Sequence, residues 1–178
     1  MALTFTTEMK VCTPCLIVGF ILFCVSFGSA SWFYDASNVY YGLWKFCLNK
    51  NSCFNLGSVY FPDWLVGIDV LECIALGLQV GAMGAMILLS LRKHKFLSLF
   101  VCLAALGSGV LGAIGAAVFC VEMAITGVYV YWAFFLNLIG DVIVGLAGLG
   151  MLVNTVHAWL PRPDDSQTLE GIQNPLGI

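Results

Sequence analysis

The stretch "YYGLWKFCLNKNSC", Tyr40 to Cys53, interrupts an otherwise strongly apolar sequence. It brings together aromatic residues, Lys45 and Lys50, and two cysteines. The whole chain has 178 residues, of which 61% are hydrophobic and only 10% charged. Its mean hydropathy is +0.97. A soluble domain carries far more polar surface than this composition supplies. The chain is therefore expected to lie in a membrane, with this polar segment outside the bilayer.

Charged residues are clustered, so long uncharged tracts remain. Residues 12–31, 73–91 and 96–121 contain no Lys, Arg, Asp or Glu, and 131–160 contains only Asp141. A helix needs about 20 apolar residues to cross a bilayer core. We predict four spans at about 12–31, 64–91, 96–121 and 131–160, an outer loop at 32–63 and a disordered tail at 161–178. The spans form one all-α membrane domain over residues 1–160, with no second domain.

The basic residues predict how the spans are oriented. Five of the seven lie near one set of span ends: Lys10, Arg92, Lys93, Lys95 and Arg162. The loop at 32–63 holds the other two. Basic residues favour the cytoplasmic side. We expect a plasma-membrane protein with both termini cytoplasmic and the loop extracellular. No basic run with interleaved aromatics is present, so nucleic acid is not an expected partner.

A cleaved signal peptide is the alternative for residues 1–30. Lys10 precedes an apolar run, and the small residues Gly28 and Ala30 stand where cleavage would occur. The run is long for a signal peptide, however, and its start carries charges of both signs. A retained first helix is the favoured interpretation.

The extracellular loop carries a candidate disulfide. Cys47 and Cys53 would meet an oxidising environment there, and their short spacing suits a cross-link within a β-hairpin or a tight loop. The segments 31–35, 39–47 and 57–61 are rich in aromatic and β-branched residues, which is typical of strands. The alternative is two unpaired thiols in an irregular loop.

These residues also carry a resemblance to a known family. Trp32, the triplet Gly42-Leu43-Trp44, and then Cys47 and Cys53 resemble the W…GLW…C…C signature of the claudin superfamily. Four spans, cytoplasmic termini, a longer first outer loop and a short second one fit the same pattern over nearly the whole chain. The short loop is nearer to the peripheral myelin protein and epithelial membrane protein branch than to typical claudins.

Two features depart from these families. The chain has no Asn-x-Ser/Thr glycosylation sequence, which that branch often carries in this loop. The basic residue that claudins tend to place after the loop is replaced by Asp63 and Trp64. Barrier or pore function of the claudin kind is therefore less expected.

The resemblance implies a specific architecture. It implies a left-handed four-helix bundle capped outside by a small antiparallel sheet, and a first helix that is retained. Trp32, Leu43 and Trp44 would pack the sheet onto the outer end of the bundle, and the disulfide would hold the hairpin. The polar segment would then be mainly a structural platform for a partner.

Polar residues within the spans are the strongest local anomalies. A carboxylate at the centre of a spanning helix costs roughly 2.5–3.5 kcal/mol on insertion scales. Counting about 1.5 Å of rise per residue puts Asp141 near mid-membrane, with Gln79 and Ser108 at a similar depth. We predict that Asp141 is a neutral or hydrogen-bonded group inside the bundle, with Gln79 or Ser108 as its partner.

Other acidic residues are predicted to form a rim at the outer end. Asp69 and Glu72 lie one helical turn apart and so share a face. The predicted rim consists of Asp35, Asp63, Asp69, Glu72 and Glu122. Solvation near lipid headgroups would explain it. The functional alternatives are weak attraction of cations and contact with a basic loop of a partner.

Small residues recur every four positions in the third span, in two rows. The rows are Ala104, Ser108, Gly112 and Ala116, and Ala105, Gly109, Ala113 and Ala117. Small residues let membrane helices approach closely. The favoured interpretation is close packing within the bundle, and the alternative is a lateral docking face for another membrane protein.

Two further features predict modification or binding at the cytoplasmic side. Cys12, Cys15 and Cys102 lie near inner span ends and are candidate palmitoylation sites, although inert buried thiols are an equal alternative. The sequence ends in Leu176-Gly177-Ile178, apolar at the positions by which a C-terminus can bind a PDZ domain. A second disulfide, between Cys73 and Cys120, is a weaker alternative for those two residues.

No catalytic set, cofactor motif or metal-ligand spacing is visible, so the chain is not expected to be an enzyme. The favoured function is a membrane interaction protein that organises membrane or cell–cell contacts through lateral or trans association. The alternative is an auxiliary subunit of an ion channel or receptor, as in the calcium-channel gamma-like branch. A paracellular barrier or pore former is the third hypothesis. The expected partners are the bilayer, a second copy of the chain or another membrane protein, and a PDZ scaffold.

Overall fold

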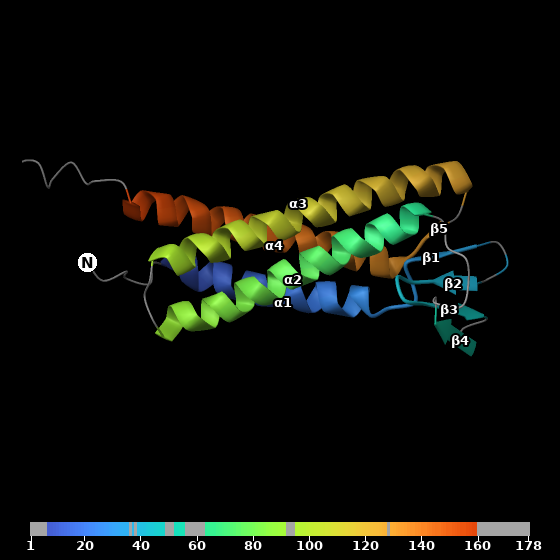
Figure 1. The fold of residues 1–178 in the computed structure, drawn as a ribbon, viewed down its shortest axis with the longest axis horizontal. Coiled ribbons are helices and arrows are strands. Elements are labelled where there is room, and N and C mark those ends of the chain that lie inside the picture. The colour runs from blue at the N-terminus through green and yellow to red at the C-terminus, as the bar shows by residue number, and fades with distance from the viewer. Residues whose placement is uncertain are drawn as a thin grey trace, which may run out of the picture.

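The computed structural model describes residues 7–35, 37, 39–48, 52–55, 63–91, 95–127 and 129–159. These form four long helices and a small sheet at one end of them (Figure 1). The helices are α1 (Thr7–Phe27), α2 (Asp63–Leu91), α3 (Lys95–Thr126) and α4 (Trp132–Trp159). All four are long and apolar enough to cross a bilayer. The predicted fold class, a four-span membrane bundle with a small antiparallel sheet, is confirmed.

Three helix boundaries differ clearly from the prediction, the first being the start of α1 at Thr7 rather than near residue 12. α1 ends at Phe27 rather than near residue 31, because Gly28 follows and the chain turns there toward the sheet. α3 continues past residue 121 to Thr126. Glu122 is compatible with this extension because it lies near the sheet end of the bundle, where a charged side chain can reach water.

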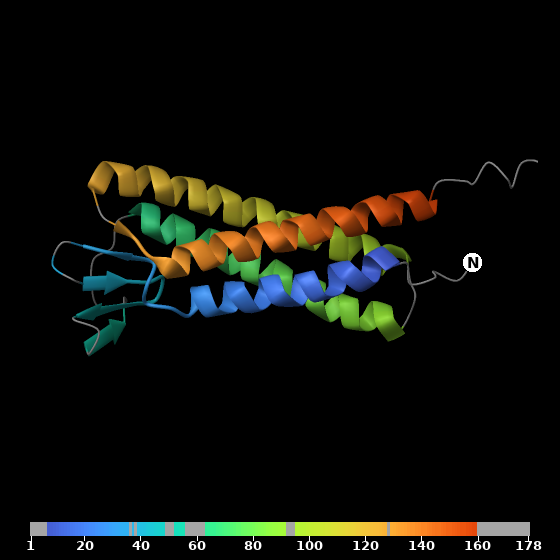
Figure 2. The ribbon, with the colours of Figure 1, turned by 180° about the vertical axis from the view of Figure 1, so that it is seen from behind.

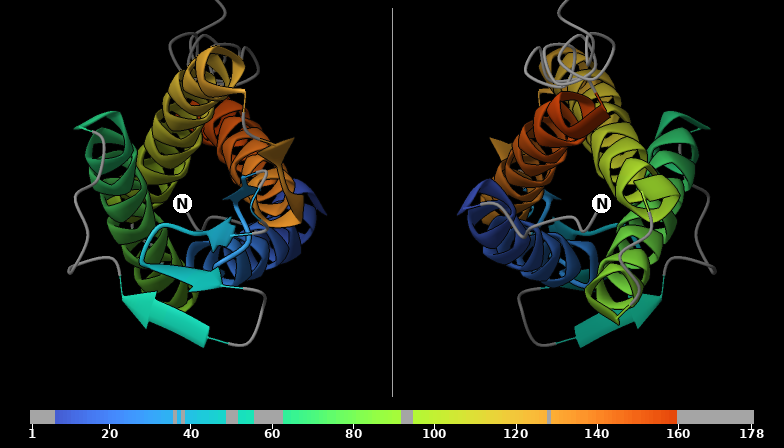
Figure 3. Two further views of the ribbon diagram at one scale, coloured as in Figure 1. Left: turned by 90° about the vertical axis from the view of Figure 1, so that its right-hand side faces the viewer. Right: turned by 90° about the vertical axis from the view of Figure 1, so that its left-hand side faces the viewer.

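The helices pack in a ring in which α2 contacts α3, α3 contacts α4 and α4 contacts α1 (Figure 3). α1 and α2 touch much less. Large apolar side chains such as Val80, Val110 and Leu146 point outward and are more than half exposed. A bilayer would cover them, because the surface of a spanning helix is solvated by lipid tails rather than water.

Glycines bring the helix backbones together at two crossings. A Cβ at Gly109 in α3 would lie 2.9 Å from the Cα of Gly145 in α4, and one at Gly19 in α1 would lie 2.9 Å from the carbonyl oxygen of Gly140. Gly109 belongs to the second row of small residues in α3, so close helix packing accounts for that part of the row, and the first row is buried throughout. The second row leaves the interface at Ala113 and Ala117, which are exposed.

The sheet has the strand order β4-β3-β2-β1-β5, and all neighbours are antiparallel. Its strands are β1 (Phe33–Tyr34), β2 (Val39–Tyr41), β3 (Lys45–Leu48), β4 (Ser52–Asn55) and β5 (Tyr129–Val130). β5 was not predicted. It follows Gly127, whose positive φ of 69° lets the chain leave α3 and pair with β1 (Figure 2). The strand predicted at 57–61 lies outside the described residues.

A buried aromatic cluster attaches the sheet to the bundle. Trp32 is 1% exposed, and its ring packs edge-on against Phe119 of α3 and Phe134 of α4. Its indole N–H donates to the Ser26 carbonyl oxygen at 3.0 Å, while the Ser26 hydroxyl donates to the Ala133 carbonyl oxygen at 2.7 Å. One side chain therefore links the end of α1, the loop and the start of α4.

The remaining signature residues have separate roles. Leu43 is buried in the same cluster. Gly42 packs against the backbone of Ser29 and Ala30 so closely that any Cβ would overlap them. Trp44 differs from the expectation in being 41% exposed, and its ring lies 5.1 Å from that of Phe27 at the end of α1.

The predicted disulfide between Cys47 and Cys53 is confirmed. The two residues oppose each other directly in the β3–β4 ladder, so the bond joins adjacent strands. The weaker alternative pairing is wrong: Cys73 and Cys120 are both exposed thiols on the outside of the bundle.

Replacing both disulfide cysteines with serine is expected to lower the free energy of unfolding by about 2 kcal/mol, because a short loop then gains conformational freedom in the unfolded chain. Unfolding of the purified protein in mixed micelles, titrated with denaturing detergent, measures this difference. Cys73→Ser is the matched control and should stay near wild type. Equal stability of the double variant and the control would contradict a stabilising role for the bond.

Candidate functional site

The three polar side chains predicted at mid-membrane meet inside the bundle. Gln79 of α2 donates from Nε2 to the Ser108 hydroxyl oxygen of α3 at 2.8 Å and to Oδ1 of Asp141 in α4 at 3.3 Å. All three side chains are 2% exposed or less. They therefore connect three helices where lipid and water are both excluded.

Two residues extend this network beyond the prediction. Asn137, one turn before Asp141 on α4, donates from Nδ2 to Asp141 Oδ2 at 3.1 Å and to Glu72 Oε1 at 3.0 Å. Glu72 corrects the predicted acidic rim, because it is 1% exposed and points into the bundle. We name Glu72, Gln79, Ser108, Asn137 and Asp141 the buried polar network.

Glycines of α3 make room for the two carboxyl groups. A Cβ at Gly112 would overlap the Asp141 carboxyl group, and one at Gly115 would lie 3.2 Å from Glu72 Oε1. Gly112, which belongs to the first row of small residues, therefore accommodates a polar side chain of α4, and Gly115, which lies outside both rows, accommodates one of α2.

Several oxygens of the network lack a hydrogen-bond partner among the described residues. They are Glu72 Oε2, Gln79 Oε1 and Asn137 Oδ1. Outside the network, Asp69 Oδ1, one turn from Glu72, is also buried without a partner in the described part of the chain. The spanning segments 64–91, 96–126 and 132–159 contain no Lys or Arg. The network thus has more acceptors than donors and no protein cation.

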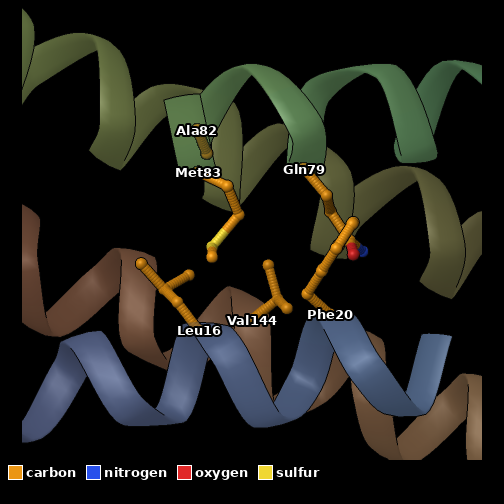
Figure 4. A pocket seen from close by; sticks show the side chains of 6 residues that line it. All are labelled: Leu16, Phe20, Gln79, Ala82, Met83 and Val144. Carbon is orange, nitrogen blue, oxygen red and sulfur yellow. The ribbon is translucent and has the colours of Figure 1, made fainter. Parts of the chain in front are cut away.

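A cavity of about 10 Å³ lies beside Gln79 between α1 and α2, lined by Leu16, Phe20, Ala82, Met83 and Val144 (Figure 4). Gln79 is its one polar lining residue (Figure 4). About 10–15 Å³ of such volume holds one water molecule. This cavity is at the lower end of that range and offers one polar residue, whereas a buried water needs about two to four polar partners, so its lining does not make a water site.

The other members of the predicted rim lie near the sheet end in different settings. Asp63 is exposed at the start of α2, Glu122 is half-buried, and Asp69 is half-buried. Asp35 shapes the chain between β1 and β2 by accepting from the backbone N–H of Ser37 at 2.9 Å and of Val39 at 3.1 Å.

Asp35 also lies next to a tyrosine of the sheet. The Tyr41 hydroxyl is 3.5 Å from Asp35 Oδ2. Burial, and then the charge of Asp35, raise the pKa of Tyr41. Together with its backbone hydrogen bonds, this contact makes Asp35 part of the structure of the sheet.

At the opposite end of the bundle, a small polar cluster joins α3 and α4. The hydroxyl groups of Ser98 and Thr155 are 2.8 Å apart, and the Cys102 thiol is 3.7 Å from the Thr155 hydroxyl. Cys102 is fully buried, so it does not fit a palmitoylation site. Cys12 and Cys15 are half-buried against the apolar core, and their lipidation stays a prediction. Leu176 and Ile178 lie outside the described residues.

One face of the sheet carries a row of aromatic rings across four strands. Phe33, Tyr41, Phe46 and Phe54 stack in order with ring centroids 4.9, 6.2 and 5.5 Å apart. Phe33 is buried against Phe119, whereas Phe54 is 49% exposed. The row therefore runs from the core of the bundle out to a surface strand.

The other face carries tyrosines and the disulfide. Tyr34 stacks on Tyr129 at 5.2 Å, and Tyr40 contacts Tyr131 at 5.5 Å. A groove of about 290 Å³ is lined by Ala30, Ser31, Tyr40, Cys47, Tyr131 and Trp132. Its position between the end of α1 and the start of α4 would bring it to the level of lipid headgroups.

No group of three His, Cys, Asp or Glu residues suited to a metal ion occurs in the part of the chain that the structure describes. The sequence matches no protein-family model, and no curated protein matches it. The resemblance to the claudin superfamily therefore rests on the signature residues and the arrangement of spans, and it stays a prediction.

Proposed function

We propose that this protein is a non-enzymatic membrane interaction protein of the claudin superfamily type, which organises membrane or cell–cell contacts by associating with itself or another membrane protein. The proposal includes a plasma-membrane location with cytoplasmic termini and an extracellular sheet. One observation carries it: a sheet that is cross-linked by a disulfide and attached to the bundle through Trp32 presents large apolar side chains beyond the ends of the spanning helices.

The candidate contact surface lies on β3 and β4. Leu48 is 41% exposed and Phe54 is 49% exposed. Both lie on the aromatic-row face, since Phe54 opposes Phe46 and Leu48 follows Phe46 by two residues. Exposed aromatic and aliphatic side chains on a pre-organised surface favour binding, because little conformational entropy is lost on contact.

The test is association of full-length chains in a native membrane. Two differently tagged copies are co-expressed, solubilised in mild detergent and isolated through one tag, and all co-purifying proteins are identified. The double variant Leu48→Ser/Phe54→Ser is expected to reduce recovery of the partner at least tenfold, which corresponds to about 1.4 kcal/mol. Tyr129→Ser, at the opposite edge of the sheet, is the matched control.

Each outcome decides between hypotheses. Recovery of the second copy or of a junctional protein, lost in the double variant, supports the proposal. A pore-forming subunit or a receptor at fixed stoichiometry would favour the alternative, an auxiliary subunit. Unchanged recovery in the double variant would overturn the role of the β3–β4 surface.

A further inference from the structure

The buried polar network contains two carboxyl groups and no basic side chain, an arrangement that helix packing alone does not require. Glu72 and Asp141 both lie within 3.1 Å of the same nitrogen, Asn137 Nδ2, so the two carboxyl groups are close neighbours. Each is at least 98% buried. Two uncompensated carboxylates in a low-dielectric interior would cost several kcal/mol each. The pair therefore requires a positive charge.

The described residues around the network supply neither the positive charge nor enough hydrogen-bond donors. An amide NH₂ group has two hydrogens. Those of Gln79 are used by Ser108 and Asp141, and those of Asn137 are used by Glu72 and Asp141. The remaining donor of the network is the Ser108 hydroxyl hydrogen, and it does not reach the open oxygens: Glu72 Oε2 and Asn137 Oδ1 have no hydrogen-bond partner among the described residues, although both residues are at least 98% buried.

The hydrogen bonds distinguish the two acids. Asp141 accepts at both of its oxygens, from Gln79 and from Asn137, as an ionised carboxylate does. Glu72 accepts at Oε1 only. The open position for a positive charge is therefore at Glu72 Oε2, on the α2 side of the network.

We propose that the buried polar network is a binding site for one small hard cation, a proton or a sodium ion, held at Glu72 Oε2. Oxygen-only ligation and a site with two rather than three acidic groups suit a single positive charge better than a divalent ion. The bound cation stabilises the contact of α2 with α4, because Asn137 links Glu72 to Asp141. This inference concerns the bundle interior and is independent of the contact surface on the sheet.

Other acidic side chains near Glu72 could also bind a proton, so the residues that surround it on each helix matter for the test. On α2 itself, Asp69 lies one turn toward the sheet and has an unpartnered, buried oxygen. α3 presents Gly112, Gly115 and Ser108, and α4 presents Asn137 and Asp141. Of the residues just named, Asp69 and Asp141 can ionise as Glu72 can. The test therefore includes variants of both.

The first measurement is the thermal midpoint of the purified full-length protein in detergent. NaCl is exchanged for choline chloride at constant ionic strength, over pH 5 to 9. We expect the wild-type midpoint to rise by several degrees with Na⁺ or with falling pH, because a ligand that binds only the folded state stabilises it. A rise with Na⁺ at fixed pH identifies sodium, and a rise with acid alone identifies the proton.

The variants Glu72→Gln and Asp141→Asn should lose this dependence, whereas Glu122→Gln, the control at the sheet end, should keep it. Asp69→Asn is expected to keep it as well, because Asp69 takes part in none of the four hydrogen bonds that join the network. A wild-type midpoint that changes with neither Na⁺ nor pH, or a dependence retained in Glu72→Gln, would overturn the proposal.

A second measurement needs no variant, so it applies even if the substituted chains fold poorly. Dicyclohexylcarbodiimide modifies protonated carboxyl groups in apolar surroundings, and mass spectrometry locates the product. Modification of Glu72 without Na⁺, suppressed by added Na⁺, supports a sodium site. Modification that Na⁺ leaves unchanged but alkaline pH abolishes supports a proton site. Modification of other acids without Glu72 would contradict both.

Discussion

The variant Trp32→Ala is expected to lose about 3–5 kcal/mol of unfolding free energy, the range for truncating a large aromatic residue in a packed core. The indole is 1% exposed and packs edge-on against the stacked rings of Phe119 and Phe134. Its removal leaves a cavity and also leaves the Ser26 carbonyl oxygen without the indole donor. Because α1, the sheet and α4 all meet at this side chain, the loss should separate the sheet from the bundle.

Detergent-titrated unfolding followed by tryptophan fluorescence gives the magnitude, and protease cleavage within residues 33–48 shows whether the sheet detaches. Trp44→Ala is the matched control, since Trp44 belongs to the same signature but is 41% exposed. It should cost less than about 1 kcal/mol. Similar losses for the two variants would mean that Trp32 does not hold the sheet through its buried contacts.

Gly109→Leu is expected to be the second most damaging substitution, with a loss of about 3 kcal/mol. A Cβ at Gly109 would meet backbone atoms of α4, namely Gly145 Cα at 2.9 Å and the Asp141 carbonyl oxygen at 3.1 Å. Backbone atoms cannot rotate away, so the helices must separate, and overpacking of this kind typically costs 1–3 kcal/mol. The separation would also stretch the hydrogen bond from Gln79 to Asp141.

Gly84→Leu on α2 is the control for this substitution. It makes the same chemical change in a spanning helix, but a Cβ at Gly84 would have nothing within 4 Å of it. Its stability in mixed micelles should match wild type within about 0.5 kcal/mol, the range for surface substitutions away from special features. If Gly109→Leu were equally harmless, α3 and α4 would not be in direct backbone contact.

The spans and the disulfide were predictable because each depends on short-range features of the chain. A bilayer requires continuous apolar helices, so the uncharged tracts predicted the four spans to within several residues. Cys47 and Cys53 lie only six residues apart in a strand-forming segment, so local chain geometry already brings them together.

The network was only partly predictable. Depth along the helices suggested that Asp141, Gln79 and Ser108 lie at one level, and they do meet. Depth does not give the direction in which a side chain points, however, and Glu72 was therefore assigned to an exposed rim. Asn137 lies four residues before Asp141, a spacing that puts both on one helix face and could have identified it.

By itself, the amino-acid sequence determined a four-span membrane protein with a disulfide-bonded polar loop, because hydropathy, charge distribution and cysteine spacing are properties of neighbouring residues. Only the tertiary structure decided which residues face one another. The pairing of β5 with β1, the burial of Trp32 but not Trp44, and the inward direction of Glu72 depend on the rotation of each helix about its axis and on contacts between distant segments. For α1, α3 and α4, the close approach of the backbones at Gly19 and Gly109, where no side chain keeps them apart, limits these rotations.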